Sequence, residues 1–106
     1  MVTFEDFKKL ELRVAKIKEV KDHPDADRLY VITIDLGDKT KQVVAGIKNY
    51  YKKEDLIGRQ VVAVDNLEPA TLRGVESQGM LLAAQDKQGI CIIAPDREVQ
   101  LGSTVK

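Results

Sequence analysis

The sequence predicts a mainly β domain folded as a closed barrel, and three observations lead to that class. Apolar and polar residues alternate in several short stretches, which is the spacing of strands with one buried face. Gly, Asp and Pro residues at turn positions separate these stretches. One interior stretch alone has helical spacing between its apolar residues. We therefore expect five strands around a single core, with a helix between the third strand and the fourth.

The N-terminal elements are predicted to be a short helix and a long, bent first strand. Thr3 is a helix-capping residue, and Glu5 and Asp6 follow it in the first turn, so we expect a helix through about Lys9. The first strand begins near Leu12, and its apolar residues change face part-way along. Such a change predicts a β-bulge, which bends a barrel strand around a corner.

The second and third strands are predicted to form a hairpin. Every second residue from Tyr30 to Leu36 is large and apolar, which predicts one buried strand face. A turn at Gly37-Asp38 follows, and residues 41–45 return as the third strand.

A helix and three further strands complete the prediction. Apolar residues at helical spacing between 47 and 57 predict the helix, and Gly58 is placed to cap it. Residues 60–64 and 80–84 form the fourth and fifth strands, and residues 90–94 form an extra one. Three strands, a helix and two strands are the order of an OB-fold barrel, whose sheet face and loops bind oligonucleotides.

Length and composition indicate one domain over residues 1–106. This length is enough for a single core, and 43% of the residues are hydrophobic. No apolar run approaches the ~20 residues of a membrane span, and the N-terminus has no signal-peptide pattern. Cys91 has no second cysteine to pair with and lies in an apolar run, so we expect a small buried side chain. These features predict a cytoplasmic protein with no membrane partner.

Three blocks, in order along the chain, resemble the tRNA-binding domain family. They are Asp22-His23-Pro24-Asp25-Ala26-Asp27-Arg28-Leu29-Tyr30, Val43-Val44-Ala45-Gly46-Ile47 and the stretch from Asn66 to Ala84. The family includes freestanding tRNA-binding proteins and the C-terminal appendix of methionyl-tRNA synthetases. The resemblance covers residues 4–106, and it implies a non-catalytic module that recognises the shape of tRNA.

The stretch between the fourth and fifth strands contains the first candidate RNA-binding residues. Its Ser-x-Gly-Met string is the most diagnostic part of the resemblance, which implies that Ser77 and Met80 face an open groove and contact tRNA. A hydroxyl can bind ribose or phosphate, and a thioether can pack on a base. Arg73 can bind a phosphate with two N–H groups, and an ion pair with Glu68 or Glu76 is the alternative.

Three further candidates lie on or next to predicted strands. Arg13 is expected on the outer, ligand-facing side of the first strand, with Lys41 as its basic neighbour. Asn66 either reads a base edge or anchors its loop on the backbone.

Charge predicts a modest electrostatic contribution to RNA binding. Residues 1–53 contain 12 basic and 9 acidic side chains, net +3, and residues 54–106 contain 5 and 8, net −3. Relatives often have basic residues where this chain has Ala70-Thr71. We therefore expect contacts through shape and a few specific groups, because few phosphates can be neutralised.

The resemblance also implies partners. Freestanding members of the family pair as homodimers through segments outside the barrel, and a methionyl-tRNA synthetase catalytic chain is a further candidate partner. The side chains assigned to the dimer contact are Phe4, Phe7, Ile90, Ile92 and Leu101. The alternative for the isoleucines is that the barrel itself covers them.

Other classes of function remain open at this stage. A CsaA-like peptide-binding chaperone would need an apolar groove between subunits. A single-strand-binding OB module would need stacking aromatic residues, and the chain has five aromatic side chains in all. No activated nucleophile or Gly-rich phosphate loop is present, so we expect neither an enzyme nor a cofactor. His23, Asp25 and Asp27 could meet at a metal, but a structured turn is the preferred interpretation.

Overall fold

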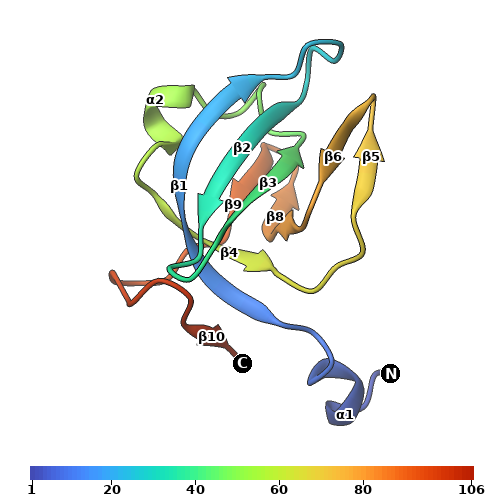
Figure 1. Ribbon diagram of the computed structural model, residues 1–106, viewed down its shortest axis with the longest axis vertical. Helices are drawn as coiled ribbons and strands as arrows, with labels where there is room; N and C mark the ends of the chain where they lie inside the picture. Colours follow the sequence, from blue (N-terminus) through green and yellow to red (C-terminus); the bar gives the residue numbers. More distant parts are fainter.

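The computed structural model describes residues 1–106 and contains an antiparallel sheet coiled into a nearly closed barrel (Figure 1). The elements are α1 (Phe4–Phe7), β1 (Leu12–Asp22), β2 (Tyr30–Asp35), β3 (Thr40–Ala45), α2 (Lys53–Leu56), β4 (Gln60–Val64), β5 (Ala70–Leu72), β6 (Val75–Ser77), β7 (Met80–Leu81), β8 (Ala83–Asp86), β9 (Gly89–Ile92) and β10 (Thr104–Val105). The barrel strands follow the order β3-β2-β1-β4-β7, and β10 adds to β1. The predicted mainly β, OB-type barrel is confirmed.

Strand β1 turns the sheet into a barrel. Its first half pairs with β4, from Leu12 opposite Val64, and its second half pairs with β2. The β1–β2 register shifts between Ile17 and Glu19, which confirms the predicted bulge. Because a bulge adds an unpaired residue to one strand, β1 bends there and carries the β2–β3 hairpin around the core.

The core follows the alternation of β2. Tyr30, Ile32, Ile34 and Leu36 are each at most 4% exposed and belong to one cluster of 13 buried residues. A second, smaller cluster consists of Leu12, Val62 and Val64. Strand β4 is therefore buried on both faces, because the partly buried Leu82 and Val105 pack on the second cluster from outside the barrel.

Two predicted helices are shorter in the structure. Thr3 caps α1 as expected, since its Oγ1 accepts the Asp6 N–H, but the helix ends at Phe7. The interior helix is a single turn, α2. Residues 48–50 form a turn before it, and Tyr30 Oη donates a hydrogen bond to the Tyr51 carbonyl oxygen at 2.7 Å, which holds that segment against the barrel. Neither helix is long and apolar enough to span a membrane.

The C-terminal half differs most from the prediction. The expected strand 80–84 is interrupted, because β7 pairs with β4 whereas β8 pairs with β9 in a separate two-stranded sheet. Residues 70–77 form a hairpin, β5–β6, in place of the expected open loop. Cys91 is exposed, contrary to the prediction, because Ile90 and Ile92 occupy the inward face of β9.

Candidate nucleic-acid interface

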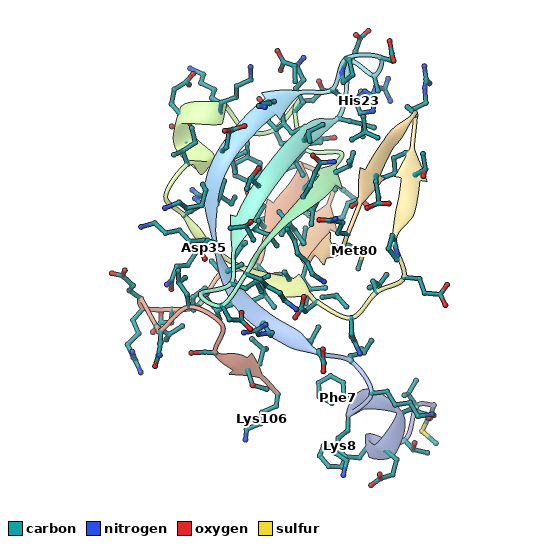
Figure 2. The ribbon with its side chains drawn as sticks, in the orientation of Figure 1. Phe7, Lys8, His23, Asp35, Met80 and Lys106 are labelled. Atoms are coloured by element: carbon teal, nitrogen blue, oxygen red, sulfur yellow. The ribbon has the colours of Figure 1, made fainter.

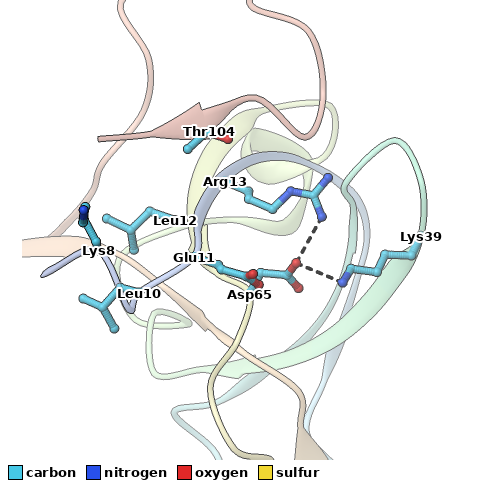
Figure 3. A pocket seen from close by; sticks show the side chains of 8 residues that line it. All are labelled: Lys8, Leu10, Glu11, Leu12, Arg13, Lys39, Asp65 and Thr104. Carbon is cyan, nitrogen blue, oxygen red and sulfur yellow. Dashed lines mark hydrogen bonds and ion pairs between the residues drawn. The ribbon is translucent and has the colours of Figure 1, made fainter. Parts of the chain in front are cut away.

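A cluster of charged side chains surrounds Asp65, which directly follows β4 (Figure 3). Its side chain is only 2% exposed. Arg13 and Lys39 lie 3.0 and 2.9 Å from its Oδ2, and the Lys41 ammonium lies 2.7 Å from Oδ1. The Lys41 ammonium also donates to the Asp65 main-chain carbonyl oxygen at 2.6 Å. One buried anion thus gathers three cations, and the group has a net charge of +2.

The basic neighbours of Asp65 keep its carboxyl group deprotonated. Burial would by itself raise the pKa of the Asp65 carboxyl, because desolvation disfavours the charged form. Hydrogen bonds from Lys41, Lys39 and Arg13 outweigh desolvation and hold that pKa well below its usual range. Asp65 therefore remains an anion, and its partners are attracted inward rather than left free for a ligand.

Arg13 has a structural role, and Lys41 is its basic neighbour as expected, because both bind Asp65; RNA binding by Arg13 stays a prediction. Its guanidinium donates to the Asp65 carboxylate, to Asp38 at 3.0 Å and to the carbonyl oxygen of Gly102 at 3.1 Å. All three of its nitrogens are thus engaged, and they join β1, the β2–β3 turn, the end of β4 and the C-terminal segment. Gly102 has φ +85, and a Cβ there would lie 2.6 Å from the guanidinium.

Asn66 anchors its loop, as the second of its two interpretations predicts. The Glu11 N–H donates to Asn66 Oδ1 at 2.8 Å, and Asn66 Nδ2 donates to the Lys9 carbonyl oxygen at 2.6 Å. Both ends of the amide are therefore bound to the segment between α1 and β1. No polar atom of this side chain is left without a partner to read a base.

Ser77 closes the barrel and does not face an open groove, contrary to the prediction. It is 5% exposed, its Oγ accepts the Val44 N–H at 2.9 Å, and it donates to the Gly79 carbonyl oxygen. No strand ladder joins β3 to β7, so the hydroxyl supplies a bond that a ladder would make. Gly79 permits the close approach of the strands, since a Cβ there would lie 2.8 Å from the Val64 carbonyl oxygen.

Met80 is a predicted RNA-binding residue whose side chain stays accessible. Its side chain is 46% exposed, and its backbone pairs with Val64 on β4 (Figure 2). A groove of about 530 Å³ lies next to this pair, under the loop after β4. The residues lining it are Thr40, Lys41, Asp65, Asn66, Leu67, Glu68, Pro69 and Gln78. Lys41 lines this groove and is also bound to Asp65, whereas Met80 does not line it and pairs with Val64, the residue directly before Asp65.

The β5–β6 hairpin carries Arg73 to the other end of the barrel, away from this groove (Figure 1). Arg73 and Gly74 form a two-residue turn with φ +53 and +87, the left-handed backbone that such tight hairpins need. Arg73 donates to the Asp25 carbonyl oxygen at 3.1 Å and forms neither of the predicted ion pairs. The Arg-Gly pair between Leu72 and Val75 was the sequence signal for this hairpin.

His23 ties the hairpin to the β1–β2 connection and was absent from the predicted site. The Asp25 N–H donates to its Nδ1 at 2.9 Å, and its Nε2 lies 2.9 Å from the Leu72 carbonyl oxygen. Because a backbone N–H can only donate, Nδ1 must accept, and Nε2 carries the hydrogen that Leu72 receives. With both ring nitrogens occupied and the ring 5% exposed, the interpretation as a structured turn fits better than a metal ligand.

The comparisons with known proteins agree with this arrangement. A family model described as "Putative tRNA binding domain" matches residues 12–104, from the first residue of β1 to the first of β10. The chain belongs to this tRNA-binding family. The family predicted from the three sequence blocks is therefore confirmed.

Its relatives include much longer proteins. The methionine–tRNA ligase of Thermococcus kodakarensis is 59% identical over 105 residues, and that of Nanoarchaeum equitans is 52% identical over 106. The alignments cover 99% and 100% of this chain but only 14% of each ligase. The chain thus spans about one seventh of the length of these curated relatives.

Solved structures of similar length share the fold. A CsaA chaperone protein from Picrophilus torridus is 34% identical with a TM-score of 0.93, and both chains are covered completely. A MetRS related protein from Pyrococcus horikoshii is 30% identical with a TM-score of 0.92, over 100% of this chain and 98% of that one.

Proposed function

We propose that the chain binds tRNA, without chemistry of its own, as an accessory of a methionyl-tRNA synthetase. The observation that carries the proposal is the exposed Met80 of the Ser-x-Gly-Met string, placed beside a polar groove in a member of a tRNA-binding family. Ser77 and Gly79 of the same string close the barrel, so the string holds Met80 in place against β4. A cytoplasmic location follows from this role.

The electrostatics of the groove favour a small number of phosphate contacts. The lining of the groove contains one cation, Lys41, and two anions, Asp65 and Glu68, whereas Arg13 and the 43% exposed Lys39 line the neighbouring pocket on the other side of Asp65. Each phosphate contact contributes roughly 0.9 to the slope of log affinity against log salt on duplex nucleic acid. One or two contacts therefore predict a shallow slope, and recognition then depends on shape and on backbone and 2′-hydroxyl groups.

The test is a salt titration of binding to folded tRNA, with single-stranded RNA and an unfolded polypeptide in parallel. Preference for folded tRNA with a shallow salt slope supports the proposal. Met80→Ala is expected to weaken tRNA binding without changing the melting temperature. Ile57→Ala is the matched control, because this apolar residue is 52% exposed next to α2 and away from the groove. Equal affinities of the two variants would remove Met80 from the site.

A homodimer is part of the proposal, with a reduced set of contact residues. Phe4 is 68% and Phe7 37% exposed on α1, which stands away from the barrel (Figure 2). Leu101 and Ile90 are half-buried. Ile92 is only 7% exposed and packs in the barrel's own core, so we no longer include it among the dimer-contact residues. Sedimentation of the wild type and of a Phe4→Ser, Phe7→Ser variant tests this. A dimeric double variant would exclude α1 from the interface.

A second candidate function is a peptide-binding chaperone. The observation that favours it is the full-length similarity to the CsaA chaperone protein of Picrophilus torridus. The unfolded-polypeptide arm of the titration discriminates between the two functions. Binding of the polypeptide in preference to tRNA would favour the chaperone.

A further inference from the structure

All three tyrosines of the chain line one pocket beside α2. The pocket has a volume of about 370 Å³, and its lining residues are Tyr30, Lys48, Asn49, Tyr50, Tyr51, Lys52 and Asp55. It shares no residue with the groove beside Met80. The barrel therefore has a second pocket, and its lining differs chemically from that of the groove.

Two of the tyrosines build the pocket and one remains available. The Tyr30 hydroxyl donates to the Tyr51 carbonyl oxygen, and the Tyr51 hydroxyl accepts the Ile92 N–H at 3.0 Å. The Arg59 guanidinium also lies over the Tyr51 ring, 5.4 Å from its centre. Tyr50 makes no hydrogen bond through its hydroxyl and is 50% exposed. Its ring is the accessible aromatic surface of the pocket.

The Tyr50 ring is held in place from one side. It lies directly against Gly89, at the turn between β8 and β9, so closely that a Cβ at that position would overlap the ring. Gly89 also has φ +122, a conformation that favours glycine. The glycine thus lets the ring rest on backbone, and the remaining exposed part of the ring faces solvent. A fixed aromatic surface of this kind loses little conformational entropy when a flat ligand stacks on it.

The groups around the ring complement a nucleotide. The Lys48 ammonium is oriented by Asp22 at 3.1 Å, whereas Lys52 forms no ion pair and is free to bind an anion. Asn49 offers an amide with both donor and acceptor atoms, which suits a base edge. Base stacking on an aromatic side chain combined with a nearby ammonium is the chemistry by which single-stranded RNA is bound.

We propose that this pocket binds one unpaired nucleotide of an RNA, with its base stacked on Tyr50 and its phosphate near Lys52. This extends the proposed tRNA-binding function, on which it rests for the source of the nucleotide. The Met80 groove then contacts the folded part of the RNA, and the Tyr50 pocket contacts a nucleotide that is not base-paired.

The experiment measures binding of three RNAs to the full chain: tRNA, a blunt-ended RNA duplex and a single-stranded tetranucleotide. Tyr50→Ala is expected to weaken binding of tRNA and of the tetranucleotide roughly 5- to 100-fold, the usual range for loss of one stacked base. Tyr50→Phe keeps the ring and should retain affinity within about twofold. Binding of the blunt duplex should be the same for all three proteins. Lys52→Ala should reduce the salt slope for the single-stranded tetranucleotide by about 0.7.

A direct readout separates this proposal from the proposed function. The NMR signals of the Tyr50 ring should shift when the tetranucleotide is added to the wild type, even if tRNA itself does not bind. Shifted ring signals without tRNA binding would contradict the tRNA function and retain the pocket. Unshifted ring signals, or equal affinities of wild type and Tyr50→Ala for the tetranucleotide, would overturn the pocket. Melting curves of all three variants establish that they are folded.

Discussion

At one end of the barrel the loops are joined by a buried carboxylate and its cations, whereas at the other end they are joined by hydrogen bonds to backbone atoms. Asp65 draws Arg13, Lys39 and Lys41 together below β4. His23 instead links the β1–β2 connection to the β5–β6 hairpin through Nε2, which donates to the Leu72 carbonyl oxygen, while Nδ1 accepts the Asp25 N–H within the connection. Both arrangements bring together segments distant in sequence, but the first depends on ion pairs and the second on hydrogen bonds to the backbone.

The difference shows which residues are free to bind RNA. A buried carboxylate must be compensated by cations, so the Asp65 cluster uses basic side chains that would otherwise attract phosphate. Neutral bonds at His23 use no lysine or arginine charge, and they leave Arg73 exposed at the hairpin tip. Basic residues in the sequence are therefore poor guides to the RNA site in this chain, while Met80 and Tyr50 remain accessible.

The largest effect is expected from Asp65→Asn. The substitution removes the anion and leaves three cations close together, and breaking a buried ion pair in this way costs about 3–5 kcal/mol. Urea unfolding measures the loss. Asp38→Asn is the matched control, because Asp38 contacts the same Arg13 but its side chain is 63% exposed, so its loss should be much smaller. Equal effects of the two changes would mean that the Asp65 cluster contributes no more than a surface ion pair.

The same cluster predicts acid sensitivity. The pKa of Asp65 is held below its usual range in the folded chain and returns to about 3.9 on unfolding. A lowered folded pKa stabilises the protein fully above the unfolded pKa, and this contribution is lost as the pH falls from about 4 toward the folded value. Stability measured between pH 6 and pH 2 should fall steeply in the wild type and less steeply in Asp65→Asn. Parallel curves would contradict the assignment.

At the neutral end, His23→Ala is expected to cost about 1–3 kcal/mol, because it leaves the Asp25 N–H and the Leu72 carbonyl oxygen without their partner. Hydrogen exchange should also become faster in the hairpin. His23→Asn keeps an acceptor near the Asp25 N–H but is too short to reach Leu72, so it should recover part of the stability and none of the hairpin protection. Uniform changes across the whole chain in both variants would mean that His23 acts only through the core.

The barrel could be predicted from the sequence because its signals are local. The alternation from Tyr30 to Leu36 needs no knowledge of partners, and the change of face in β1 marks the bulge directly. The family blocks also identified the string that contains Met80. These features are fixed by pleat, burial and turn geometry, which act over a few residues.

The roles of the candidate side chains depend on pairing across the fold and could not be predicted in this way. Arg13 meets Asp65 across 52 positions of sequence, and Ser77 meets Val44 across 33. Lys41 was expected on the third strand, but nothing local showed that a carboxylate lies opposite it or that Lys39, just before β3, binds the same group. A buried group that needs a charge partner is visible only once the strand register is known.

The smallest effect is expected from Gly74→Ala at the hairpin tip. Gly74 has φ +87 and no atom within 4 Å of an added Cβ, so the cost is backbone strain alone, about 1 kcal/mol. Gly46→Ala is the matched control, because it has an ordinary φ and its nearest neighbour, Leu29, is 3.6 Å from the added Cβ. Chemical denaturation should place Gly46→Ala close to wild type. If Gly74→Ala is equally stable, the left-handed turn contributes little, and the bonds of His23 and Arg73 hold the hairpin in position.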